Sequence, residues 1–170
     1  LNVSASPHVR DRVSTREIML DVCIAMIPTA VYGVVQFGLH ALWVILVTVA
    51  AAVLSEYLWQ CGMKKEVTIT DCSAVVTGLI LALNMPPEIP LWIPALGAVF
   101  AIIIAKQMFG GLGQNFMNPA LAGRCFLLIS LAKYMNNFTS KPINFDATTG
   151  ATPLAIMKTA MKAGTPATAD

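Results

Sequence analysis

The sequence predicts an all-α polytopic membrane protein with about five transmembrane helices. Three observations lead to this prediction. Of the 170 residues, 56% are hydrophobic. Only 12% are charged, about half the fraction found in soluble domains. From Ile24 to Ser55 no residue is formally charged, and this stretch is too long for one crossing of about 20 residues. Such a composition excludes a disordered chain and a nucleic-acid-binding domain.

The first two spans share the long uncharged stretch. Residues 36–40 contain a glycine and two polar side chains, which suit a tight turn at a membrane interface. Glu56, Trp59 and Gln60 are expected at the next interface, with Trp59 in the aromatic belt. We expect a transmembrane bundle over residues 18–134, with spans near 18–36, 41–59, 71–86, 91–106 and 119–134.

The third span is short, because Thr70-Asp71 resembles a helix cap and Pro86-Pro87 ends the apolar run. Its polar residues, which include Thr77 and Asn84, also fit an ion site on an interrupted helix, although capping explains them without one. Asn118 as cap and Pro119 as first helical residue open the fifth span. Arg124 inside that span needs a polar partner or extends to the cytoplasmic interface, and we expect the latter.

The distribution of lysine and arginine predicts the orientation. Basic residues cluster before the first span and in two alternate loops, at Arg10, Arg12, Arg16, Lys64, Lys65 and Lys106. The other two loops contain none. By the positive-inside rule, residues 1–17 form a cytoplasmic segment and residues 135–170 form an external loop.

The external loop contains the strongest local motif. Asp146 precedes Thr149-Gly150-Ala151-Thr152, and Pro153 follows at the first position of a short predicted helix. Taken alone, Thr152 is explained by helix capping. A second polar, glycine-rich segment lies between the fourth and fifth spans and includes Gly110, Gly111, Asn115 and Asn118. Its glycines allow close backbone approach to a flat ligand, and its amides suit the polar edge of that ligand, although an ordinary turn also explains them.

Several motifs, in this order along the chain, resemble one family. They are Ser6-Pro7-His8, the segment 17–21, Thr70-Asp71 with Thr77-Gly78, residues 84–87, residues 110–120 and Thr149–Thr152. This set resembles the family of the RnfD subunit of the Rnf complex, the ion-translocating ferredoxin:NAD oxidoreductase. The related NqrB subunit of the sodium-pumping quinone reductase shares the later motifs.

The resemblance implies a membrane electron-transfer subunit in the cytoplasmic membrane of a prokaryote. FMN would be joined by a phosphoester to Thr152, with Asp146, Thr149, Gly150 and Ala151 as the attachment motif. A second, non-covalent flavin (riboflavin) would contact Gly110, Gly111, Asn115 and Asn118. The family fold has about ten spans in two repeats, so this chain corresponds to the N-terminal repeat.

The implied partners are membrane iron–sulfur subunits, a second subunit with covalent FMN, and cytoplasmic subunits linked to ferredoxin and NAD. Electron flow would drive Na⁺ or H⁺ translocation. An NqrB-type subunit and a urea-transporter-like channel or carrier are the alternatives. We predict no catalytic residue of its own and no metal site, because the four cysteines lack ligand spacing.

Overall fold

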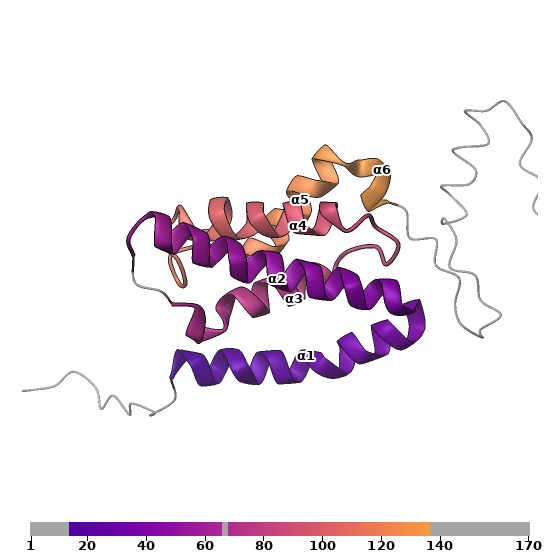
Figure 1. Cartoon of the computed structure of the whole chain (residues 1–170), viewed down its shortest axis with the longest axis horizontal. Helices are drawn as coiled ribbons and strands as arrows, with labels where there is room; N and C mark the ends of the chain where they lie inside the picture. Colours follow the sequence, from indigo (N-terminus) through magenta and orange to yellow (C-terminus); the bar gives the residue numbers. More distant parts are fainter. Residues whose placement is uncertain (1–13, 66–67, 137–170) are drawn as a thin grey trace, which may run out of the picture.

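A computed structural model describes residues 14–65 and 68–136, and these ranges contain helices and no strands (Figure 1). The expectation of an all-α fold is therefore confirmed for the described part of the chain. The elements in chain order are α1 (Thr15–Phe37), α2 (Leu39–Gly62), η1 (Ile69–Asp71), α3 (Ser73–Leu83), α4 (Trp92–Phe100), η2 (Ala101–Gln107), α5 (Pro119–Ser130) and α6 (Ala132–Met135).

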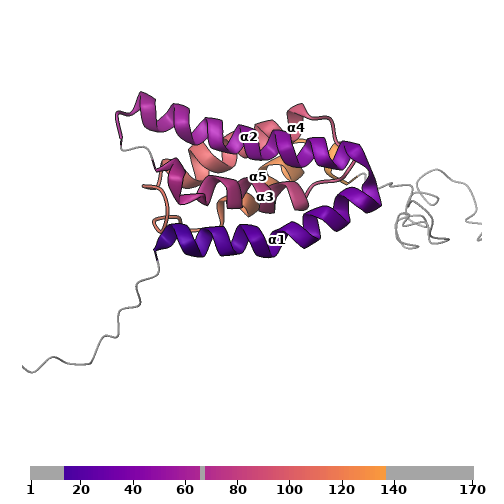
Figure 2. The same cartoon turned by 60° about the horizontal axis from the view of Figure 1, so that its bottom comes forward.

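Two long apolar helices, α1 and α2, run in opposite directions along the bundle (Figures 1 and 2). The start of α1 is fixed by a capping box, in which Glu17 N–H donates to Ser14 Oγ at 3.3 Å and Ser14 N–H donates to Glu17 Oε2 at 2.9 Å. Gly38, with φ of 82°, separates the two helices. With 23 and 24 residues, α1 and α2 are long and apolar enough to cross a membrane.

The remaining apolar helices are shorter. Helix α3 has 11 residues, α5 has 12, and α4 continues directly into η2. At 1.5 Å per residue, α3 is about 17 Å long, roughly half the thickness of the hydrocarbon core. Helices therefore occupy all five expected spans, while the number that cross the membrane stays a prediction.

The start of α3 differs from the expectation. Ile69–Asp71 forms a separate 3₁₀ turn, and Cys72 adopts a left-handed conformation with φ of 61°. Helix α3 therefore begins at Ser73, two residues later than expected. Cys72 is the N-cap residue and makes no side-chain cap bond, but Asp71 Oδ1 accepts hydrogen bonds from Ser73 N at 2.9 Å and Ser73 Oγ at 2.7 Å and so satisfies the first N–H of the helix.

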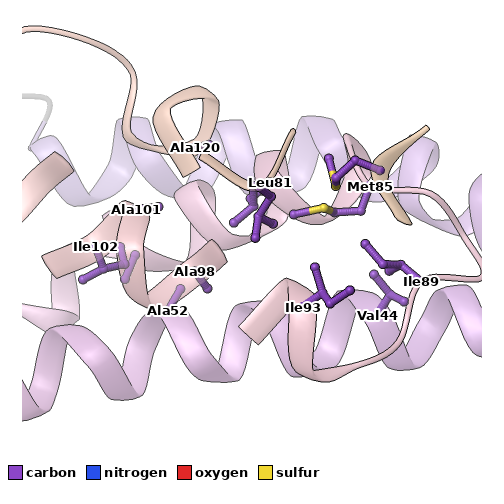
Figure 3. Close-up of a cluster of buried hydrophobic side chains, with 13 residues drawn as sticks. Val44, Ala52, Leu81, Met85, Ile89, Ile93, Ala98, Ala101, Ile102 and Ala120 are labelled. Atoms are coloured by element: carbon purple, nitrogen blue, oxygen red, sulfur yellow. The ribbon is translucent and has the colours of Figure 1, made fainter. Parts of the chain in front are cut away.

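The core lies where α2, α3, α4, η2 and α5 meet (Figure 3). Gly78 on α3 makes a close approach to α2 possible, because a Cβ at this position would lie 2.9 Å from Val49 Cα. Gly123 on α5 similarly packs against α4, where its Cβ would lie 2.8 Å from Gly97 O. Small residues at crossings are typical of membrane helix bundles. The core includes Val44, Ala52, Leu81, Met85, Ile89, Ile93, Ala98, Ala101, Ile102 and Ala120.

Loops from distant parts of the chain share each end of the bundle. His40 Nδ1 lies 2.7 Å from Pro87 O, so the α1–α2 turn meets the segment between α3 and α4 at one end. The start of α1, the end of α2 and the segment after η2 lie at the other end (Figure 1). Below, these are called the His40 end and the Gly62 end.

Candidate functional site

A buried ion pair joins α2 to η2. Lys106 Nζ lies 2.8 Å from Glu56 Oε1 and 2.9 Å from Glu56 Oε2, and it also donates to Ser73 Oγ at 2.6 Å. The side chains of Lys106 and Glu56 are only 2% and 1% exposed. Isolated charges are costly inside a protein, and this pair is compensated by mutual attraction and hydrogen bonds.

The π-helical geometry of η2 positions this pair. Lys106 and its neighbour Gln107 both reach the same carboxylate, with Gln107 Nε2 donating to Glu56 Oε1 at 2.6 Å. On α2, Gln60 Nε2 lies 3.3 Å from the same oxygen and also donates to Thr68 Oγ1 at 2.8 Å. Segments of π-helix are rare and often occur at functional sites.

This arrangement corrects one expectation from the sequence. The sequence predicts Glu56 and Gln60 at a membrane interface, which stays a prediction, and the structure adds that the bundle buries both side chains, at 1% and 3% exposed. It also predicts Lys106 as a loop charge that sets orientation, yet this residue is 1% exposed and belongs to a helix. The spacing of Glu56 and Gln60, four residues apart, places them on one helix face and is a usable signal. The partner on η2, fifty residues away, is not readable from local patterns.

A cavity of about 320 Å³ lies beside the ion pair, between α3, η2 and the segment before α5. We call it the Asn115 cavity. Its size falls at the lower end of the range for small-molecule sites. Its apolar walls include Met19, Val76, Ile80, Leu112 and Met117. Its polar groups come from Ser73, Thr77, Lys106, Asn115 and Asn118.

The amides of this cavity keep hydrogen-bonding capacity. Asn115 Oδ1 is buried and has no partner within the described ranges. Asn118 caps α5 as expected, with its Oδ1 accepting from Ala120 N at 3.0 Å, which leaves its amide nitrogen as a donor. A buried acceptor without a partner is costly, and a rotation of the Asn115 amide would bring this oxygen to the cavity, where it could receive a ligand N–H.

The glycines of the same segment are divided between two cavities. Gly110, Gly111 and Gly113 all have positive φ, at 114°, 95° and 84°. Gly113 lines the Asn115 cavity, whereas Gly110 and Gly111 line a neighbouring polar cavity of about 250 Å³. We call this second one the Glu56 cavity, because Glu56, Gln60, Thr68, Asp71 and Gln107 contribute to it. The structure thus brings Asn115 and Asn118 together at one cavity and places Gly110 and Gly111 at the other.

Arg124 does not extend to the interface as expected. Its Nη1 donates to Asn84 Oδ1 at 2.8 Å, and Asn84 lies at the far end of α3 from Ser73. Asn84 Nδ2 in turn donates to Ile80 O at 2.8 Å. Because a charged side chain within a membrane bundle needs polar neighbours, this amide gives the guanidinium one.

The attachment motif Thr149–Thr152 and Asp146 lie outside the described residues, as do Arg10 and Arg12.

Within the described part, no group of three or more histidine, cysteine or acidic residues is placed to hold a metal ion. The four cysteines are all free thiols.

The helical membrane bundle and the ordered series of motifs agree with comparison to known proteins. The NQR2, RnfD, RnfE family matches residues 2–169, and the chain belongs to this family. Over its whole length, the chain is 47% identical to the D subunit of the Na(+)-translocating ferredoxin:NAD(+) oxidoreductase complex of Acetobacterium woodii, and it covers 53% of that protein.

Two further relatives are the D subunits of similar complexes. The chain is 47% identical to the D subunit of the proton-translocating ferredoxin:NAD(+) oxidoreductase complex of Clostridium ljungdahlii. This match covers 92% of the chain and 47% of the relative's length. The chain is 42% identical to the D subunit of the ion-translocating oxidoreductase complex of Escherichia coli, in a match that covers 80% of the chain and 39% of the relative's length. The chain thus spans about half the length of the curated relatives it matches, or less.

Proposed function

We propose that this chain is part of a membrane electron-transfer subunit in an ion-translocating ferredoxin:NAD oxidoreductase complex. The names of its relatives support this assignment, and both Na⁺ and protons occur among them. The subunit lies in the cytoplasmic membrane of a prokaryote, with the Gly62 end and the N-terminus on the cytoplasmic side. Lys64 and Lys65 at that end agree with the positive-inside rule. Its partners are the iron–sulfur, FMN-bearing and ferredoxin- or NAD-linked subunits of the complex.

Covalent FMN on Thr152 is the first cofactor of this proposal. The support is the motif Thr149–Thr152 together with family membership. A phosphoester on a residue followed by Pro153 would also lie at the start of a helix, where free N–H groups favour an anion.

In-gel flavin fluorescence of the denatured full-length subunit tests this attachment. We expect a fluorescent band that Thr152→Val abolishes and that Thr149→Val weakens. A dark wild-type band from a host that has the flavin transferase would contradict the proposal, and fluorescence retained in Thr152→Val would place the anchor on another hydroxyl.

A second, non-covalent flavin in the Asn115 cavity is the other cofactor. The observation that carries this assignment is the buried Asn115 Oδ1 without a described partner, in a cavity with apolar walls. A flavin ring has one N–H donor between two carbonyl acceptors along its pyrimidine edge. Asn115 can accept from that N–H, while the amide nitrogen of Asn118 can donate to one of the acceptors. The residues present therefore fit a flavin.

When bound there, the flavin would accept and pass on electrons, which is chemistry the protein side chains lack. The chain's own residues hold and orient the ring. Val76, Ile80 and Leu112 would supply apolar contacts to the ring. Gly113, with φ of 84°, lets the backbone turn beside the cavity.

Acid extraction followed by chromatography tests the second flavin. We expect the full-length subunit to release one flavin on denaturation, and we expect Asn115→Leu to lower the released amount at least tenfold. Asn136→Leu is the matched control, because Asn136 is exposed and lies outside the cavity. Equal release from Asn115→Leu and the control would contradict this site.

A further inference from the structure

The ion pair between Glu56 and Lys106 is oriented relative to the two cavities. Lys106 and Ser73 line the Asn115 cavity, whereas Glu56 lines the adjoining Glu56 cavity together with Lys65 and Asp71. Of the two charged groups of the pair, the cation therefore borders the Asn115 cavity and the carboxylate does not. Both groups are buried, so water screens this dipole only weakly.

We propose that this oriented pair makes the Asn115 cavity bind a reduced, negatively charged flavin more tightly than an oxidised, neutral one. Lys106 is the cation beside the ring, and Glu56 is a positioning residue that acts through Lys106. The inference rests on the second flavin of the proposed function, and it identifies the Glu56–Lys106 pair as the group that sets the flavin's reduction potential.

The charge balance of the reduction gives the sign of the effect. Two electrons from a redox partner and one proton from water convert the neutral oxidised ring to a reduced ring with one negative charge. That charge resides mainly on the N1–C2=O part of the pyrimidine edge, the edge matched above to Asn115 and Asn118. A buried cation nearby stabilises the added charge, and a buried anion further away opposes it more weakly.

Contacts on the ion pair limit how Lys106 can move. Its ammonium group is held by both Glu56 oxygens and by Ser73 Oγ, at 2.6 to 2.9 Å. Gln107 and Gln60 hold Glu56 in turn. The cation is therefore fixed beside the cavity before any ligand binds, which is the arrangement that electrostatic preorganisation requires.

A redox titration of the full-length subunit tests the proposal. The subunit is purified in detergent with Thr152→Val, so that non-covalent flavin is the flavin under study, and it is titrated with dithionite and mediators. We expect Lys106→Gln to lower the midpoint potential and Glu56→Gln to raise it. Each shift should reach a tenfold change in the ratio of affinities for reduced and oxidised flavin, which is about 30 mV for two electrons.

Opposite signs distinguish a charge effect from a general loss of structure, which would move both variants in the same direction. Glu88→Gln is the control, because Glu88 is an exposed acid near the His40 end, and it should leave the potential unchanged. Glu56→Gln combined with Lys106→Gln leaves no buried charge unpaired. Since this double variant loses the whole oriented pair, we expect its potential to lie below that of the wild type.

Each outcome decides a separate claim. If the wild-type protein releases no non-covalent flavin, the second cofactor of the proposed function fails and this inference fails with it. If flavin is present and the double variant matches the wild type, the cofactor assignment stands and the role of the ion pair is refuted. Single variants that shift in the same direction would also refute it.

Discussion

Replacing Glu56 by glutamine removes the charge that Lys106 contacts through both carboxylate oxygens. Glutamine has nearly the same volume, so the cost is electrostatic rather than steric. The ammonium group would keep Ser73 Oγ at 2.6 Å and one amide oxygen, with its side chain 2% exposed. Breaking a buried pair on one side costs about 3–5 kcal/mol, and we expect a loss of stability in this range.

The reverse substitution, Lys106→Met, should cost about 3 kcal/mol, the lower end of the same range. Gln107 and Gln60 would still donate to the carboxylate, so Glu56 would be less isolated than Lys106 is in the first variant. Combining the two substitutions leaves no unpaired charge. The coupling energy of the double-mutant cycle should therefore reach at least about 2 kcal/mol.

Unfolding of the detergent-solubilised protein by SDS, followed by tryptophan fluorescence, measures all four free energies of unfolding. Glu88→Gln again serves as the control for loss of one acid, with an expected change within about 0.5 kcal/mol. Additive effects of the two substitutions, within about 0.5 kcal/mol, would refute the argument that Glu56 and Lys106 compensate each other.

Three further predictions follow from the packing and the loops. Gly78→Ala should destabilise the bundle by about 1–3 kcal/mol, because the new Cβ would lie 2.9 Å from the α2 backbone. Gly33→Ala is the control and should not destabilise the bundle, because nothing lies within 4 Å of a Cβ at that position. SDS unfolding compares the two variants. Asn84→Leu should cost about 1.5–3 kcal/mol in the same assay by depriving Arg124 of its partner, while Asn84→Asp should be tolerated. Glu88→Cys, made in a cysteine-free background, should react with a membrane-impermeant maleimide on intact cells, because position 88 is exposed and lies at the proposed external end. Labelling only after permeabilisation would show that the orientation is opposite to the proposed one.

Local patterns in the sequence predict the helices well. Apolar runs indicate where α1 and α2 lie, and Asn118-Pro119 marks the start of α5, because capping depends on neighbouring residues alone. They miss the start of α3, since the left-handed conformation of Cys72 has no clear signature in a residue other than glycine or asparagine.

The buried charges are harder to predict. A lysine after an apolar run usually marks the end of a membrane span, and a glutamate near a tryptophan usually marks an interface, so local patterns give Lys106 and Glu56 unrelated roles. Their pairing depends on how η2 packs against α2, which is a property of the tertiary structure. The candidate ligand amides Asn115 and Asn118 can be identified from the sequence, but the division of the glycine segment between two cavities cannot.

The π-helical form of η2 has a consequence for the length of this segment. Its hydrogen bonds span five residues where those of an α-helix span four, as in the bond from Met108 N to Ile103 O at 3.0 Å. If the same number of residues formed an ordinary α-helix, the end of this segment would be rotated by about 100°, the step of one residue, relative to its start. Lys106 would then turn away from Glu56, although every residue that contacts the pair would remain in the chain. The site therefore depends on the π-helical form of this segment as well as on the identity of its residues, and a chain one residue shorter here would keep Lys106 facing Glu56 only by forming α-helical turns instead.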